Sequence, residues 1–311
     1  MIKYYNIANR QIAESTAADA RVVVYICQDE SERQEAIEQL GLDAHDVESA
    51  LDPDEISRIE YYEEGRTFII WKEALQARFD ESLRFDVLSV GIFLEPNKIS
   101  FVTSADIIYF SPREYRGIET PAAVFLRYLQ STTRHYLEHL KGIKLITGEI
   151  QSKINTSMEN KYLLQMFSLS ESLVYYMNAI ESNELVMTKL NVNLKKLALT
   201  EDQQELLDDI RLDNQQCSRQ AQTYSTVLSG LMDARGNIIN NNMNLLLRDL
   251  TLLNVIFLPL NLIASIGGMS EFSMMTKPLD WRISYALFFL GMVALGVLTW
   301  MILTRMLRRR H

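Results

Sequence analysis

NIINNNMNLLLRDLTLLNVIFLPLNLIASIGG, residues 237–268, carries small and polar side chains at regular steps through the most hydrophobic helix predicted for this chain. The steps alternate between three and four residues, so these side chains share one stripe of an α-helix. The stripe consists of Asn237, Asn240, Asn244, Leu247, Thr251, Asn254, Leu258, Asn261, Ser265 and Gly268. Because asparagine is costly in hydrocarbon unless it meets a polar partner or water, the stripe predicts a water-filled path across a membrane.

The stripe also has a second interpretation, in which polar side chains hold membrane helices together without a pore. A single asparagine would favour that interpretation. This stripe stays small or polar at nearly every step, and only Leu247 and Leu258 interrupt it. Rings of leucine between polar rings suit a gate that closes by dewetting. The pattern therefore favours a pore.

Two uncharged, mostly apolar runs are long enough to cross a bilayer, which takes about 17 to 25 helical residues. The first run, Leu250–Ile266, is interrupted by Asn254, Pro259 and Asn261. The second run, Ile283–Leu303, is plainer, and its expected close-packing points are Gly291, Ala294 and Gly296.

Basic residues set the expected orientation in the membrane. Only Lys277 and Arg282 lie between the two runs, whereas the second run is followed by Arg305, Arg308, Arg309 and Arg310. The positive-inside rule places this arginine cluster in the cytoplasm, and two crossings place the large N-terminal part there too. We therefore expect a protein of the cytoplasmic (inner) membrane with both termini cytoplasmic. A disulfide between Cys27 and Cys217 is not expected in that reducing compartment.

The part before the membrane runs predicts a mixed α/β domain followed by long helices. Expected strands are Arg21–Cys27, Arg66–Lys72 and a hairpin of Phe85–Leu94 with Lys98–Thr103. Expected helices run from about Ser31 to Leu40, ending at Gly41, from Ala122 to about Ser157, from Glu159 to about Leu197 and from Glu201 to about Gly267. The last helix has Thr200 as its N-cap and would be about 100 Å long.

The predicted domain organisation has a cytoplasmic α/β domain at 1–121 and cytoplasmic helices packed on it at 122–200. A long stalk helix at 201–267 becomes the first membrane span at about 250–267. A short outer loop at 268–282, a second span at 283–304 and a basic cytoplasmic tail at 305–311 follow. The formal net charge of −9 argues against a nucleic-acid partner and is compatible with a surface that handles cations.

Three stretches together resemble the CorA family of divalent-cation channels. The first is GLDAHDVESALDPDEISRIEYYEEGRTFIIWK at 41–72, and the second is LSVGIFLEPNKISFVT at 88–103. The third is the most specific and combines Ser229-Gly230-Leu231-Met232-Asp233, Asn244, Phe257-Leu258-Pro259-Leu260 and Gly268-Met269-Ser270, where the family has Gly-Met-Asn. The similarity follows nearly the whole chain in order.

The resemblance implies a funnel-shaped homopentamer in the lipid bilayer, with no covalently bound cofactor and no enzymatic activity. Its substrate would be a divalent cation, Mg²⁺ or a transition metal such as Zn²⁺, Co²⁺ or Ni²⁺, which could also regulate it. Family positions place Asn244, Leu247, Leu250, Asn254, Leu258, Asn261 and Gly268 along the pore, and Gly268, Met269 and Ser270 at the outer mouth. Asp209 falls at an acidic position of a regulatory metal site between subunits, or else on a solvated helix face beside Asp208 and Asp213.

Ser270 is the departure from the family motif. The family's asparagine meets a hydrated ion through its amide, and Mg²⁺ gives up its waters reluctantly. A ring of shorter serine hydroxyls would be wider and less defined. The substitution therefore leaves the selectivity for magnesium open, with Zn²⁺, Co²⁺ or Ni²⁺ as alternatives.

Other candidate sites are weaker. His135 and His139 have a spacing that can hold zinc, but two histidines without a third ligand more often lie on a solvated or partly packed face. Glu271 and Asp280 in the outer loop could concentrate cations at the mouth. No phosphate-binding glycine loop, nucleophile motif or Cys/His cluster is present in the sequence, which argues against catalysis.

Two functions follow from these observations. The first is a homopentameric transport channel for divalent cations. The second is a membrane scaffold or metal sensor that retains the same fold without transport. The polar stripe favours the first, and Ser270 leaves the second open.

Overall fold

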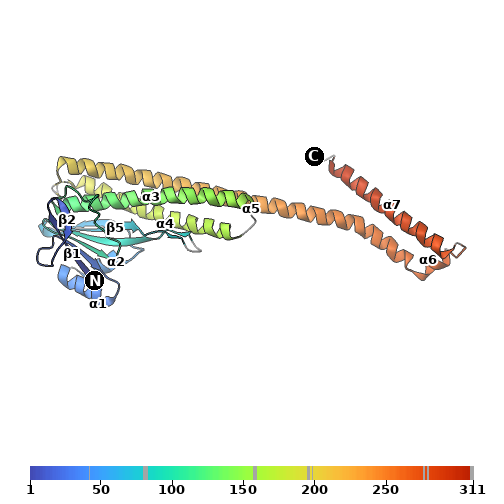
Figure 1. Ribbon diagram of the computed structural model, residues 1–311, viewed down its shortest axis with the longest axis horizontal. Coiled ribbons are helices and arrows are strands. Elements are labelled where there is room, and N and C mark those ends of the chain that lie inside the picture. Colours follow the sequence, from blue (N-terminus) through green and yellow to red (C-terminus); the bar gives the residue numbers. More distant parts are fainter. Residues whose placement is uncertain are drawn as a thin grey trace. The chain divides into compact units, whose positions relative to one another are not determined.

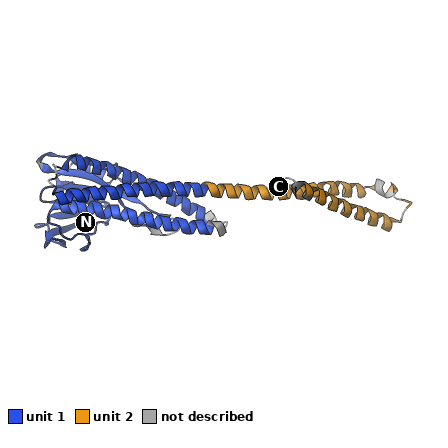
Figure 2. Ribbon diagram, turned by 90° about the horizontal axis from the view of Figure 1, so that it is seen from above, with its two compact units in different colours: residues 1–232 blue, residues 233–311 orange. Residues whose placement is uncertain are grey.

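The computed structural model describes residues 1–41, 43–79, 83–156, 160–194, 197, 199–275, 277–278 and 280–308. Its contacts divide the chain into two compact units, Met1–Met232 and Asp233–His311 (Figure 2). The long helix α5 (Glu201–Gly267) contributes residues to both units. Each unit is described separately below.

Unit 1 is built on a seven-stranded sheet with the order β2-β1-β3-β9-β8-β5-β4 (Figure 1). Its strands are β1 (Ile2–Ala8), β2 (Gln11–Glu14), β3 (Val22–Ile26), β4 (Arg58–Tyr61), β5 (Thr67–Ala74), β8 (Val87–Leu94) and β9 (Ile99–Thr103). β3 and β9 pair in parallel, and the other neighbours in this sheet pair antiparallel. A further pair joins β6 (Arg78–Phe79) to β7 (Leu83–Arg84).

The four strands expected from the sequence are confirmed as β3, β5, β8 and β9. Every residue of β3, β5 and β9 is buried, which explains why apolar residues predominate in these strands. The hairpin turn between β8 and β9 is closed by a hydrogen bond from Glu95 N to Lys98 O. The structure adds β1, β2, β4, β6 and β7, which the sequence did not predict.

Helices cover both faces of the sheet (Figure 1). On one face lie α1 (Glu30–Leu40) and α2 (Ala44–Leu51), packed on Val23, Phe68 and Ile70 among others. On the other face lie α3 (Pro121–Thr156) and α4 (Asn160–Val192), and the first part of α5 joins their apolar clusters. The fold is therefore an α/β/α arrangement, in agreement with the predicted mixed α/β domain.

Local hydrogen bonds explain where the helices begin and end. Gly41 ends α1 in the left-handed conformation, with φ of 62°. Thr200 caps α5 as predicted, because Thr200 and Gln203 exchange side-chain to backbone hydrogen bonds. α4 ends earlier than the predicted Leu197, because the Asn193 side chain donates to the Lys189 carbonyl and takes the place of the next helical N–H. The predicted start at Glu159 lies outside the described residues.

Unit 2 contains the end of α5, the short helix α6 (Ser270–Met275) and α7 (Trp281–Arg308). The predicted outer loop at 268–282 thus contains a helical turn. α5 and α7 each carry an apolar segment long enough to cross a membrane. The part of the predicted basic tail beyond Arg308 lies outside the described residues.

One buried side chain attaches α4 to β5, the neighbour of the edge strand β4. β4 pairs with β5 only as far as Ile70, which leaves the next backbone groups of β5 without a strand partner. Asn183 fills this gap: its Oδ1 accepts from Lys72 N at 2.9 Å, and its Nδ2 donates to Lys72 O at 2.8 Å. Asn183 is fully buried, and its Oδ1 also accepts from Ser57 Oγ. The amide therefore acts as one more rung of the sheet.

We predict that Asn183→Ala lowers the free energy of unfolding by about 2 to 4 kcal/mol, because it leaves the buried N–H and C=O of Lys72 without partners. Thermal or denaturant unfolding of the full chain in detergent measures this change. Asn178→Ala is the matched control, because Asn178 lies on the exposed face of the same helix. Equal losses in the two variants would contradict the role of Asn183.

Candidate cation pathway

The polar stripe lies along the second part of α5, and its side chains are exposed in the single chain. Leu247 and Leu258 of the stripe are 53% and 67% exposed, and Leu250, a pore position implied by the resemblance, is 56% exposed. The polar and small members are exposed as well: Asn244, Thr251, Asn254, Asn261, Ser265 and Gly268. The contacts between α5 and α7 show which face of α5 is covered.

α7 packs against the face of α5 opposite the stripe. Gly267 is buried against the Phe288 ring, which would overlap a Cβ atom at this position. The side chain of Leu260 lies 3.5 Å from where a Cβ atom of Gly296 would stand. Partly buried residues continue this face: Leu252, Ile256, Leu260 and Ile263. At about 100° per residue, the centre of this face lies roughly 180° from the centre of the stripe.

Of the two glycines expected as close-packing points in the second span, one contacts the first span in the single chain. Gly296 lies against Leu260, as its small size predicts. Gly291 has nothing within 4 Å of its Cβ direction in the single chain. Sequence reasoning missed Gly267 and Phe288, although a glycine one residue before the Gly-Met-Ser motif is itself a signal of close helix packing.

The stripe offers neutral oxygen acceptors and no charged group. Its amide oxygens belong to Asn244, Asn254 and Asn261, and its hydroxyls to Thr251 and Ser265. Thr251 Oγ1 donates to Leu247 O at 2.7 Å, so its proton is used within the helix and its lone pairs face the stripe. Neutral oxygens of this kind can accept hydrogen bonds from the waters of a hydrated cation.

The Gly-Met-Ser motif forms the junction between α5 and α6. Gly268 N donates to Ala264 O and Ser265 O at 3.1 and 3.2 Å, and Met269 N donates to Ile266 O at 3.1 Å. These bonds satisfy the last carbonyls of α5. Ser270 then begins α6, and all three motif residues are exposed in the single chain.

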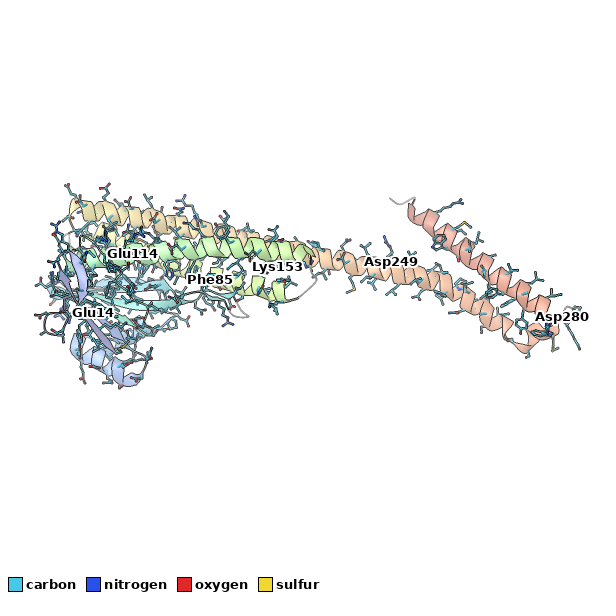
Figure 3. The ribbon with its side chains drawn as sticks, in the orientation of Figure 1. Glu14, Phe85, Glu114, Lys153, Asp249 and Asp280 are labelled. Atoms are coloured by element: carbon cyan, nitrogen blue, oxygen red, sulfur yellow. The ribbon has the colours of Figure 1, made fainter. Side chains whose placement is uncertain are left out.

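The two acidic residues expected near the outer mouth belong to different structural elements. Glu271 lies in α6. Asp280 immediately precedes α7 (Figure 3), and its Oδ1 accepts from Arg282 N at 2.9 Å. Asp280 is therefore the N-cap of α7. Its effect on cation concentration at the mouth stays a prediction.

Asp209 lies on the exposed face of α5 in unit 1. Among the residues that the structure describes, no group of three or more His, Cys, Asp and Glu side chains could hold a metal. The role of Asp209 in a regulatory metal site stays a prediction.

His135 and His139 lie on a partly packed face of α3, in agreement with the favoured interpretation of this pair. Their ring centroids are 4.1 Å apart, and His139 Nδ1 lies 2.5 Å from Tyr176 Oη. Burial lowers the pKa of His139 to about 4 and also lowers that of His135, so both rings are neutral near pH 7. Nothing in the described part of the chain supplies a third metal ligand beside them.

Comparisons with known proteins agree with this architecture. Residues 23–309 match the family model described as "CorA-like Mg2+ transporter protein". The cobalt/magnesium transport protein CorA of Methanocaldococcus jannaschii is 27% identical over 277 residues, which cover 85% of each chain. The complete structure of the CorA magnesium transporter from the same organism superposes with a TM-score of 0.73 at 20% identity, over 98% of both chains.

A second full-length structure, that of the CmaX protein, has a TM-score of 0.71 at 11% identity and covers 98% of this chain and 97% of its own. These likenesses confirm the predicted fold class, in which an α/β domain precedes a long helix and a C-terminal helix. Since the family model covers nearly the whole sequence, this chain is a member of the CorA-like Mg²⁺ transporter family, a membrane transport protein for divalent cations and not an enzyme.

Proposed function

We propose that five copies of this chain assemble around the polar stripes of α5 and form a channel for divalent cations in the cytoplasmic (inner) membrane. The position of the stripe carries the proposal: it lies on the face of α5 opposite the contacts with α7. Within one chain, α7 therefore cannot shield the amides of Asn254 and Asn261 from lipid.

The cost of exposed amides favours assembly. An amide moved from water to an apolar environment without a hydrogen-bond partner costs about 1 to 3 kcal/mol by protein measurements. Each copy carries two amides, Asn254 and Asn261, within its apolar segment. An assembly that turns these stripes toward a shared aqueous axis removes the cost for every copy. The number five rests on the resemblance to the CorA family.

The substrate proposed here is a hydrated divalent cation. The archaeal relative is named a cobalt/magnesium transport protein, which supports Mg²⁺ and Co²⁺. Ser270 replaces the amide of the family motif, and its hydroxyl reaches less far toward the axis. We therefore infer a selectivity that is less strict for Mg²⁺, with Co²⁺, Zn²⁺ and Ni²⁺ conducted as well.

Cysteine substitution tests the pore. We predict that thiol-reactive Ag⁺ blocks divalent-cation flux in liposomes for Asn254→Cys but leaves Leu253→Cys conducting, because Leu253 points about 100° away around the helix. The natural cysteines, Cys27 and Cys217, are buried and contribute little background. Equal block at both positions would show that the stripe is packing surface. An assembled oligomer that conducts none of Mg²⁺, Co²⁺, Zn²⁺ and Ni²⁺ would support the scaffold or sensor instead.

Substitution at the outer mouth tests the selectivity. We predict that Ser270→Asn raises the flux of Mg²⁺ relative to Zn²⁺ and Co²⁺, because the longer amide restores an acceptor that meets the hydrated ion. Ser270→Ala should change the ratio less, since the serine hydroxyl reaches little further than a methyl group. The measurement is liposome flux with each ion in turn. A wild type that already prefers Mg²⁺, with a ratio unmoved by Ser270→Asn, would place selection deeper in the stripe.

The proposed orientation in the membrane has both termini in the cytoplasm. It is based on the arginines after the second span, which the positive-inside rule places on the cytoplasmic side. We predict that Met275→Cys, an 82% exposed position in α6, reacts with a membrane-impermeant thiol reagent on intact cells. Glu38→Cys, on the exposed side of α1, should react only after the membrane is opened. The reverse labelling pattern would place the α/β domain outside the cytoplasm and overturn the assignment.

A further inference from the structure

Glu73 occupies a position in the sheet where an apolar side chain is expected. It follows Ile69 and Trp71 at every second residue on the face of β5 that packs on α3. Glu73 is only 8% exposed, and its one hydrogen-bond partner among the described residues is Tyr128, whose hydroxyl donates to Oε2 at 2.6 Å. A buried carboxyl group is costly and tends to persist where it has a function.

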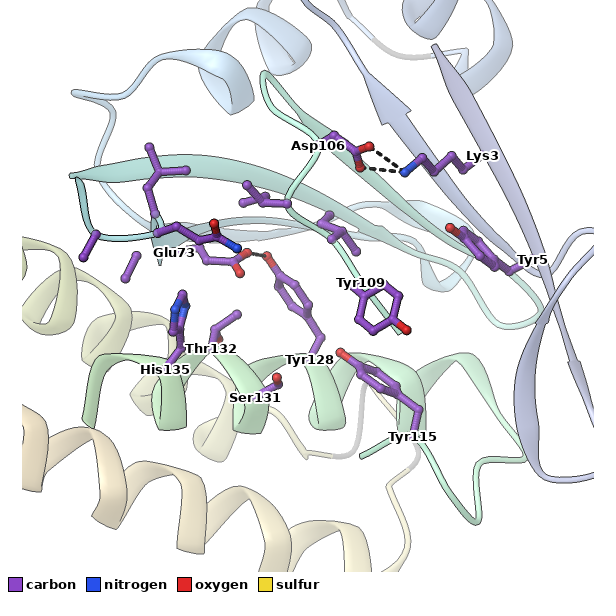
Figure 4. Close-up of a pocket in the computed structure, with 16 residues that line it drawn as sticks. Lys3, Tyr5, Glu73, Asp106, Tyr109, Tyr115, Tyr128, Ser131, Thr132 and His135 are labelled. Atoms are coloured by element: carbon purple, nitrogen blue, oxygen red, sulfur yellow. Dashed lines mark hydrogen bonds and ion pairs between the residues drawn. The ribbon is translucent and has the colours of Figure 1, made fainter. Parts of the chain in front are cut away.

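The Glu73 side chain belongs to the wall of a cavity of about 710 Å³ (Figure 4). β1, β5, the segment after β9 and α3 all contribute to its lining. This volume lies within the range of small-molecule sites, about 300 to 1,000 Å³, and exceeds what a single hydrated ion needs. The cavity is therefore large enough for an organic ligand.

Of the described charged side chains that line the cavity, one has no partner of opposite charge. Lys3 and Asp106 neutralise each other, since Lys3 Nζ donates to both carboxylate oxygens at 2.7 Å (Figure 4). His135 also lines the cavity, and burial lowers its pKa, so its ring is neutral. Glu73 is then the remaining charge of the lining, and it is negative when ionised. An anionic ligand is disfavoured, because none of the described residues that line the cavity is an arginine.

Aromatic rings supply the second element of recognition. Tyr5, Tyr109, Tyr115 and Tyr128 all line the cavity. Tyrosine faces attract cations, and the attraction grows where water is excluded. A buried carboxylate together with tyrosine rings suits an organic ammonium group. It suits a bare metal ion poorly, because the described residues contain no cluster of three metal-binding side chains.

We propose that this cavity of the α/β domain binds a small organic cation, an aliphatic amine whose ammonium group meets Glu73 and whose carbon chain lies among the tyrosine rings. The site is separate from the polar stripe of α5. The proposal is independent of which metal ion the chain transports.

Calorimetric titration of the full chain in detergent with putrescine, at about pH 8, tests this site. The expected result is saturable binding of one diamine per chain, with an affinity that falls about tenfold or more in Glu73→Gln, since a charge-assisted hydrogen bond is lost. Glu73→Gln keeps the size of the side chain and an acceptor for Tyr128. Glu38→Gln, an exposed acid on α1, is the matched control and should bind as the wild type does.

A second variant fills the cavity without changing its charge. Ser131→Phe, on the α3 wall, should abolish putrescine binding while Glu73 stays in place. 1,4-Butanediol, which has the same chain length and no charge, should give no saturable heat. Gel filtration and circular dichroism of each variant show whether the fold is kept.

The pH dependence adds an independent readout. Burial raises the pKa of Glu73 to about 7, so the carboxyl group loses its charge as pH falls through that value. Putrescine stays doubly protonated over this range. Its affinity should therefore drop about tenfold between pH 8 and pH 6, and Glu73→Gln should remove this dependence.

Three outcomes would overturn the proposal. Equal affinity of the wild type and Glu73→Gln would show that the amine binds elsewhere, for example in the pore. Equal binding of 1,4-butanediol would show that charge plays no part. Displacement of putrescine by Mg²⁺ in the wild type, lost in Glu73→Gln, would assign the cavity to a metal ion.

Discussion

The side-chain amides of Asn254 and Asn261 need water or a polar partner, and this requirement governs the arrangement of the membrane unit. α7 meets α5 through Gly267 and Leu260, on the face that carries no amide. The close contact at Gly267 depends on the missing Cβ, so the same small residue sets the rotation of α5 against α7. Among the residues that the structure describes, this polar face of the apolar segment has no partner, and the proposed assembly would supply one.

Buried polar groups of the α/β domain fall into two kinds. Asn183 bonds to both backbone groups of Lys72, so its amide stabilises the sheet and leaves nothing for a ligand. Lys72 likewise uses its ammonium group on Pro53 O and Ser89 Oγ. Glu73, the next residue, points to the other face and shares a cavity with hydroxyl groups. Adjacent positions of one strand thus serve stability and recognition separately.

The sequence predicted the features whose pattern of residues is visible within a single strand or helix. Continuous apolar runs identified β3, β5, β8 and β9, and the three-and-four spacing identified the stripe of α5. The edge strands β2 and β4 have four residues each, and β1 is only half buried, so their patterns were too weak. The cavity was missed because Lys3, Glu73 and His135 come from distant segments that only the fold brings together. The one hint of the cavity within a single strand was Glu73, an acidic residue two positions after Trp71 on the same face of β5.

The parallel pairing of β3 with β9 has a consequence for how the chain is made. The two strands are separated by most of the α/β domain, so the centre of the sheet cannot close until β9 has left the ribosome. Roughly 150 residues then separate Thr103 from the start of the first apolar segment at Leu250. At about 5 to 20 residues per second, translation of that interval takes about 7 to 30 s. Since domains generally fold in milliseconds to seconds, the sheet has time to form before the first span reaches the insertion machinery.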